Sequence, residues 1–81
     1  MREERRLFIR IELTESAKSH AEKAGIDINS ATQALDANTF VGDRVSFGGD
    51  AADDFVVIRR RHLIGTGPAI LVLTLDHPAR N

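Results

Sequence analysis

The chain has 81 residues, of which 28% are charged, with a formal net charge of −1 and no cysteine. A chain of this length predicts one domain, residues 1–81, with a small core, because short chains bury a smaller share of their surface. The lack of cysteine excludes disulfides and thiolate metal sites. The near-neutral charge does not by itself require a nucleic-acid partner.

The first six residues, MREERR, are charged and precede only a short apolar run. This pattern is unlike a secretion signal or a membrane-spanning helix. We therefore expect a cytoplasmic protein that has no membrane partner.

The first predicted elements are a strand and a helix. The stretch LFIRIEL, Leu7–Leu13, alternates apolar and polar residues, which predicts a strand with one buried face. Thr14 is a suitable N-cap for a helix, and Gly25 stands where that helix would end. Its inner face is predicted to consist of small residues that allow close packing against a sheet: Ala17, Ala21 and Ala24.

A second helix is predicted from Asn29 or Ser30 to about Ala37, with Ala31, Ala34 and Leu35 facing inward. The pattern then changes to strands, which are predicted over 44–47, 55–64 and 69–75. The last of these, AILVLTL, is apolar on both faces and belongs in the interior of a sheet. The expected fold is α+β, in the order βααβββ, with a mainly antiparallel four-stranded sheet and two helices packed on one face.

The stretch FVVIRRRHLI, 55–64, places charged residues in the middle of a predicted strand. Regular alternation predicts that one face carries Phe55, Val57, Arg59, Arg61 and Leu63, and that the other carries Val56, Ile58, Arg60, His62 and Ile64. Burying an unpaired guanidinium would cost more than a small domain can spare. We therefore expect both faces to be open to water or to a ligand near Arg60.

Three passages, IELTESAKSHAEKAGI, INSATQALD and FVVIRRRHLIGTGPAILVLTLDHPAR, together with the βααβββ order, resemble the RelE/ParE superfamily of bacterial toxins and its BrnT-like relatives. The resemblance spans most of the chain. It implies a metal-independent endoribonuclease without a cofactor, acting on free or ribosome-bound mRNA, or a gyrase inhibitor. It also implies a cognate protein partner, either an antitoxin or a target protein, and RNA or the ribosome as a further partner.

The resemblance also implies a site. In ribonuclease chemistry of this kind, cations stabilise the developing phosphorane charge, and a base and an acid move protons. Arg59 or Arg61 matches the arginine of the family's strand, and His77 with Arg80 matches its basic C-terminal tip. His62 is a candidate acid or base, and Arg44 and Arg60 are candidates for binding substrate. The family's tyrosines and central lysines have no counterpart, since the chain has no tyrosine and its two lysines, Lys18 and Lys23, lie on the first predicted helix.

Other interpretations remain open. The arginines are equally well explained as a solvated strand end that pairs with Asp50, Asp53 and Asp54, and His20 as a solvated helix residue. The first third of the chain is also similar to the ribbon-helix-helix DNA-binding fold. The main alternative function is a small non-catalytic binding module, such as an immunity protein, an antitoxin-like protein or a phage-encoded inhibitor, acting through its sheet edge and charged strand end.

Overall fold

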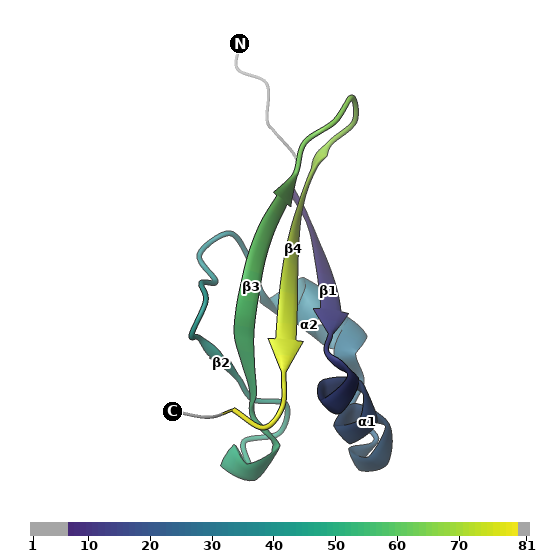
Figure 1. Cartoon of the computed structure of the whole chain (residues 1–81), viewed down its shortest axis with the longest axis vertical. Helices are drawn as coiled ribbons and strands as arrows, with labels where there is room; N and C mark the ends of the chain where they lie inside the picture. Colours follow the sequence, from purple (N-terminus) through teal and green to yellow (C-terminus); the bar gives the residue numbers. More distant parts are fainter. Residues whose placement is uncertain (1–6, 80–81) are drawn as a thin grey trace.

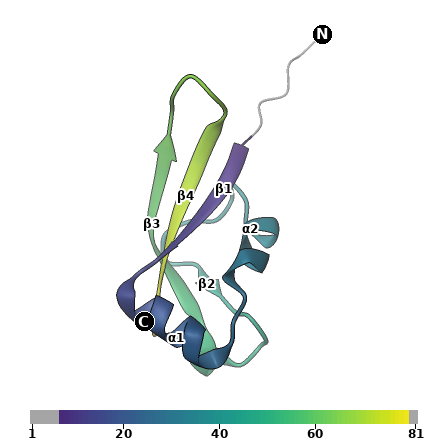
Figure 2. The same ribbon diagram turned by 90° about the vertical axis from the view of Figure 1, so that its right-hand side faces the viewer.

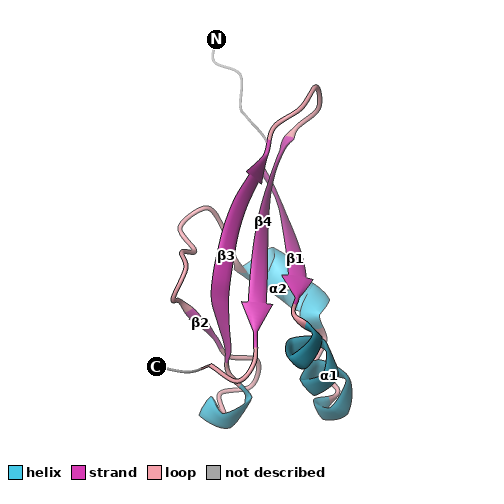
Figure 3. Cartoon of the chain, in the orientation of Figure 1, coloured by secondary structure: helices cyan, strands magenta, loops and turns pink. Residues whose placement is uncertain are grey.

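The computed structural model describes residues 7–79 and confirms the α+β class and the predicted order of elements (Figure 1). The strands are β1 (Leu7–Leu13), β2 (Arg44–Val45), β3 (Phe55–Leu63) and β4 (Ala69–Asp76). The helices are α1 (Glu15–Ala24) and α2 (Ala31–Ala34), with the short 3₁₀ turns η1 (Ile28–Ser30) and η2 (Ala51–Asp53). Figure 3 shows how small the helical part is beside the long strands.

The four strands form one sheet in the order β1-β4-β3-β2. β4 runs antiparallel to β3 but parallel to β1, with Ile9 opposite Leu71 and Leu13 opposite Leu75. The sheet is therefore mainly but not purely antiparallel, since β2–β3 and β3–β4 are antiparallel pairs and β1–β4 is a parallel pair. The helical segment between β1 and the later strands provides the long crossover that a parallel pair needs.

The prediction that the last strand is interior is confirmed, because β4 lies between β1 and β3 and residues 71–75 are all buried. Its side chains on one face join the hydrophobic core, which consists of Ala17, Ala21, Phe55, Val57, Leu71, Leu73 and Leu75. α1 and α2 both lie on this side of the sheet (Figure 2). We call it the helix side.

α1 begins and ends where its sequence predicts. Thr14 accepts a hydrogen bond from the backbone N–H of Ala17 (3.2 Å), and Gly25 ends the helix with φ of 70°, a conformation that favours glycine. The Thr14 hydroxyl also donates to Oδ1 of Asp76 (2.6 Å), which joins the helix N-terminus to the end of β4. Ala17 and Ala21 pack inward as predicted, whereas Ala24 is exposed.

The second helical segment is shorter than predicted. α2 ends at Ala34 because Leu35 adopts an extended conformation, and only Ala31 of its residues is buried. After it, the Asp36 carboxylate accepts from the backbone N–H of Asn38 (2.9 Å), a local bond that competes with helix formation. β2 is also shorter than predicted, because Gly48 and Gly49 turn the chain with positive φ soon after Val45.

β3 contains a β-bulge that the sequence pattern does not reveal. Val57 lies opposite Leu75 and Arg59 lies opposite the adjacent Thr74, so Ile58 is an extra residue. The bulge changes which residues share a face. Phe55 and Val57 face the core, but Arg59 and Arg61 lie on the opposite side of the sheet. The prediction that these four side chains share one face was therefore wrong.

Candidate functional site

The sheet face opposite the helices is not covered by any helix or strand of the described part of the chain, residues 7–79 (Figures 1 and 2). We call it the open face. Strand register and alternation place four rows of side chains across it: Phe8, Ile70 and Leu63; Arg10, Val72 and Arg61; Glu12, Thr74 and Arg59; Asp76, Val56 and Arg44.

Arg59 and Arg61 are the two predicted site residues that lie side by side on the open face. Arg10 lies on the far side of Val72 from Arg61, two strand spacings or roughly 9–10 Å away between Cα atoms. Within residues 7–79, the side chains of these three arginines form no hydrogen bond or ion pair. Their positive charge is therefore available to an anionic ligand.

Two residues between the arginines are buried although they point to the open face. Val72 is 2% exposed and Thr74 is 8% exposed, because they stand in the central strand between long side chains from both neighbouring strands. The Thr74 hydroxyl has no hydrogen-bond partner among the described residues. The floor of the open face thus contains a buried polar group beside Arg59.

Arg44 stands at one end of the same face. Its Nη1 lies 3.8 Å from Oδ2 of Asp54, and β2 holds it opposite Val56. Between this row and the bulge is a hollow of about 360 Å³ whose lining is mostly apolar: Val41, Gly42, Val56, Val57, Ile58, Asp76 and Pro78. The hollow adjoins Arg59 along β3.

Arg60 and His62 lie on the helix side, opposite Leu73 and Leu71, and are engaged there. The Arg60 guanidinium donates to the carbonyl oxygens of Ala37 (2.7 Å) and Thr39 (3.0 Å) and sits 4.7 Å from the centre of the Phe40 ring. It also donates to Nε2 of His62 (3.2 Å). While it accepts this bond, His62 is neutral and holds its proton on Nδ1.

His77 is separated from the arginines on the open face. Its ring stacks on the ring of His20 with centroids 3.6 Å apart, and its Nε2 donates to the carbonyl of Ala52 (3.2 Å). His20 in turn bonds Oδ1 of Asp53 (2.9 Å), and both rings pack near Phe55. His20 is therefore not a solvated helix residue. This cluster joins α1, η2 and the end of β4 on the helix side.

None of the three aspartates before β3 pairs with Arg59, Arg60 or Arg61 among residues 7–79. Asp50 accepts from the backbone N–H of Ala52 (3.0 Å), Asp53 binds His20 and Asp54 lies near Arg44. Arg80 lies outside the described residues. Across residues 7–79, no cluster of three or more histidine or carboxylate side chains is arranged to hold a metal ion.

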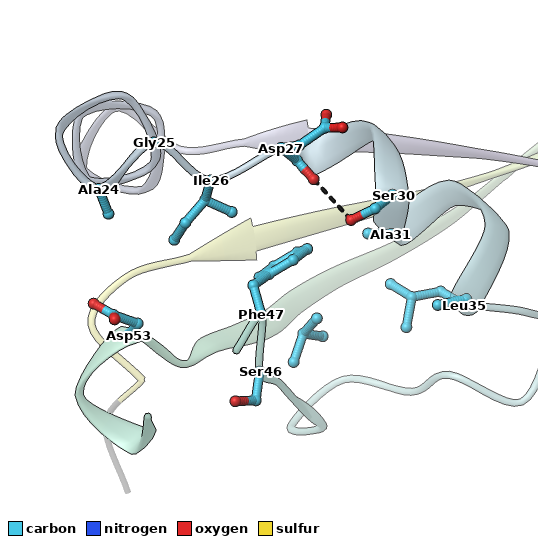
Figure 4. A pocket seen from close by; sticks show the side chains of 12 residues that line it. Ala24, Gly25, Ile26, Asp27, Ser30, Ala31, Leu35, Ser46, Phe47 and Asp53 are labelled. Atoms are coloured by element: carbon cyan, nitrogen blue, oxygen red, sulfur yellow. Dashed lines mark hydrogen bonds between the residues drawn. The ribbon is translucent and has the colours of Figure 1, made fainter. Parts of the chain in front are cut away.

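A groove of about 530 Å³ lies on the helix side, between the helical segment and β2 (Figure 4). Ile26, Leu35 and Phe47 form its apolar walls, and the Ser30 hydroxyl donates to the Asp27 carbonyl (2.8 Å) at its rim. None of the predicted site residues lines it. It is thus a surface separate from the open face.

Comparisons with protein-family models, with curated proteins and with solved structures each found no match. Neither of the helices α1 and α2, nor any other described helix, has the length and apolar character needed to cross a membrane.

The predicted site residues within residues 7–79 fall into three groups. Arg59, Arg61 and Arg44 lie on the open face, Arg60 and His62 lie on the helix side, and His77 lies beyond the end of β4. Arg10 and Glu12 were not among the residues predicted for the ribonuclease site; only the ribbon-helix-helix alternative has them face a ligand, DNA. Their polar positions in the alternation of Leu7–Leu13 were the available signal, because they had to face away from the helices.

Proposed function

We propose that this chain is a small RNA-binding domain of the toxin type, which holds single-stranded RNA against the open face of its sheet. The observation that carries the proposal is the pair of adjacent arginines, Arg59 and Arg61, which have no partner among residues 7–79 and project from an uncovered sheet. Arginine suits phosphate because its planar fork donates two parallel hydrogen bonds and stays charged.

Two further features of the open face support RNA as the ligand. The Thr74 hydroxyl, buried beside Arg59, has no hydrogen-bond partner among residues 7–79, and a ligand that displaces the side chains covering it would supply one. The apolar hollow next to the bulge offers a place for a nucleobase whose phosphate is held by Arg59. Charged contacts to phosphate together with apolar contacts to bases are the usual basis of single-strand binding.

The geometry supports binding more directly than cleavage. Cleavage at a 2′-hydroxyl needs a base near the phosphate, but His62 lies on the helix side and His77 is stacked on His20. Within residues 7–79, the carboxylate that lies in the same row as Arg59 is that of Glu12, on the other side of Thr74. If the domain cleaves RNA, we expect Glu12 rather than a histidine to take the proton.

The binding test compares the affinity for a labelled single-stranded RNA of the wild type and of the double variant Arg59→Ala/Arg61→Ala. Each arginine neutralises one phosphate. We therefore expect the plot of log association constant against log salt concentration to become less steep in the double variant, with the magnitude of its negative slope reduced by about 1.4. The matched control is Lys18→Ala/Lys23→Ala, which removes the same charge from exposed positions of α1 and should leave the slope nearly unchanged. Equal losses in both double variants would refute a specific site.

A second experiment separates cleavage from binding alone. The wild type and the same arginine double variant are expressed in a bacterial host, growth is followed, and primer extension is run on host mRNA. Growth arrest without new mRNA ends, lost in the double variant, is the result expected of RNA binding alone. New mRNA ends that disappear in Glu12→Gln would establish cleavage with Glu12 as the base.

A further inference from the structure

The outer edge of β1 has unpaired backbone groups. β1 is the first strand of the sheet and pairs only with β4 among the described residues. The N–H of Thr14 donates to the carbonyl of Leu75 (3.1 Å). By alternation along the strand, the backbone groups of the even-numbered residues point to β4 and those of the odd-numbered residues point outward. The outward groups belong to Leu7, Ile9, Ile11 and Leu13.

This edge has few of the features that normally prevent pairing with another strand, and its two charged residues, Arg10 and Glu12, are of opposite sign. Edge strands are commonly short, bulged, or interrupted by proline or lysine. β1 has seven residues without proline, lysine or glycine, and its register with β4 has no irregularity. The opposite edge strand, β2, has only two residues. Figure 2 faces the β1 edge and shows no strand or helix in front of it.

We propose that β1 pairs with β1 of a second copy of this chain, antiparallel and centred on Ile11, so that the two sheets join into one. In this register Arg10 of each copy lies opposite Glu12 of the other, and Ile9 lies opposite Leu13. Directly opposed residues of opposite charge stabilise an antiparallel pair, whereas like charges destabilise it. The outward backbone groups of Ile9, Ile11 and Leu13 then acquire partners.

Charge selects this register over its neighbours. Moving the centre to Arg10 places Arg10 opposite Arg10, and moving it to Glu12 places Glu12 opposite Glu12. Registers that are shifted by one residue, so that an odd-numbered residue of one copy lies opposite an even-numbered residue of the other, would turn the apolar side chains of the second copy to the open face. The Ile11 register alone among these combines two attractive charge pairs with continuous apolar side chains on the helix side.

The helix side of β1 also has apolar surface that a second copy would cover. Two hollows of about 500 Å³ and 310 Å³ flank the strand, one beside Leu7 and Ile9 and the other beside Leu13. The proposed pairing has a two-fold axis through Ile11, perpendicular to the sheet. This axis places the hollow beside Leu7 and Ile9 of one copy next to the hollow beside Leu13 of the other copy. The same axis leaves Arg59 and Arg61 of both copies on one shared open face.

The proposal does not depend on RNA binding and is tested by the molar mass of the full chain, measured by sedimentation equilibrium over about two decades of concentration. The wild type should dimerise. Arg10→Glu and Glu12→Arg each place like charges opposite one another twice, so each should raise the dimer Kd at least about ten-fold. Lys23→Glu, an equivalent reversal on the exposed surface of α1, should leave the Kd unchanged.

Mixing the two single variants provides the decisive control against misfolding. Arg10→Glu pairs its two glutamates with the two arginines of Glu12→Arg in the proposed register, so the mixture should form a heterodimer although neither variant dimerises well alone. Circular dichroism of each variant should match that of the wild type. A wild type that stays monomeric, or a dimer that neither reversal weakens, would overturn the proposal.

Discussion

Arg59, Arg60 and Arg61 are neighbours in sequence but differ in what their side chains contact. Arg60 is held by two backbone carbonyls, the Phe40 ring and His62, and it anchors the loop between α2 and β2. Arg59 and Arg61 have no such contacts within residues 7–79. We therefore assign a structural role to Arg60, whereas Arg59 and Arg61 are free to make the proposed contacts with RNA.

Unfolding in urea tests this division. Arg60→Ala removes charge-assisted hydrogen bonds and a cation–π contact, so the free energy of unfolding should fall by about 1–2 kcal/mol. Arg60→Lys should recover little of it, because an ammonium cannot reproduce the guanidinium fork. Arg61→Ala is the control and should change stability by less than about 0.5 kcal/mol. Equal losses at positions 60 and 61 would contradict the assignment.

At the scale of elements, the parts with strong local signals were predictable from sequence. The alternation of Leu7–Leu13, the cap at Thr14, the stop at Gly25 and the apolar run of β4 all correspond to what the structure shows. These signals are local: each depends on a few neighbouring residues whose conformation is fixed by sterics or by one hydrogen bond.

The face on which each arginine lies was not predictable in the same way. A bulge of this kind needs no glycine, and FVVIRRRHL reads as an uninterrupted strand. The bulge arises from competition between the two halves of β3, since Phe55 and Val57 must be buried while Arg59 and Arg61 must stay solvated. Only the register with β4 reveals the outcome. The end of α2 was not predictable either, because it depends on contacts of the loop that follows the helix.

Removing the bulge tests directly whether Ile58 is the extra residue. Deletion of Ile58 leaves Val57 opposite Leu75 and Arg59 opposite Thr74 in an uninterrupted strand, so Phe55 and Val57 stay in the core and Arg59 and Arg61 stay on the open face. We therefore expect the deletion variant to fold cooperatively, with a free energy of unfolding within about 2 kcal/mol of that of the wild type. Ile58→Ala, at a residue that is 43% exposed, should cost less than about 1 kcal/mol. A deletion variant that loses cooperative folding would contradict the assignment of Ile58 as the extra residue.

At the scale of the whole molecule, the fold separates two surfaces with different chemistry. Helices, core and the His20–His77 stack occupy one side of the sheet, and the other side carries Arg59 and Arg61, which have no partner among residues 7–79. The β1 edge runs along the boundary between these sides. Because self-pairing there would leave the open face uncovered, binding of RNA and dimerisation are compatible in one assembly.

Binding of RNA to the open face, as proposed above, is tested most directly by chemical-shift mapping. The ¹⁵N-labelled chain is titrated with a short single-stranded RNA while the backbone amide signals are followed. The largest shifts should occur at Arg59, Arg61, Val72 and Thr74, with little change at Ala17 and Ala21 in α1. Two results would contradict RNA binding at the open face. One is that the largest shifts occur at Ile26, Leu35 and Phe47, the walls of the groove on the helix side. The other is that no signal shifts even at RNA concentrations high enough to saturate nonspecific binding.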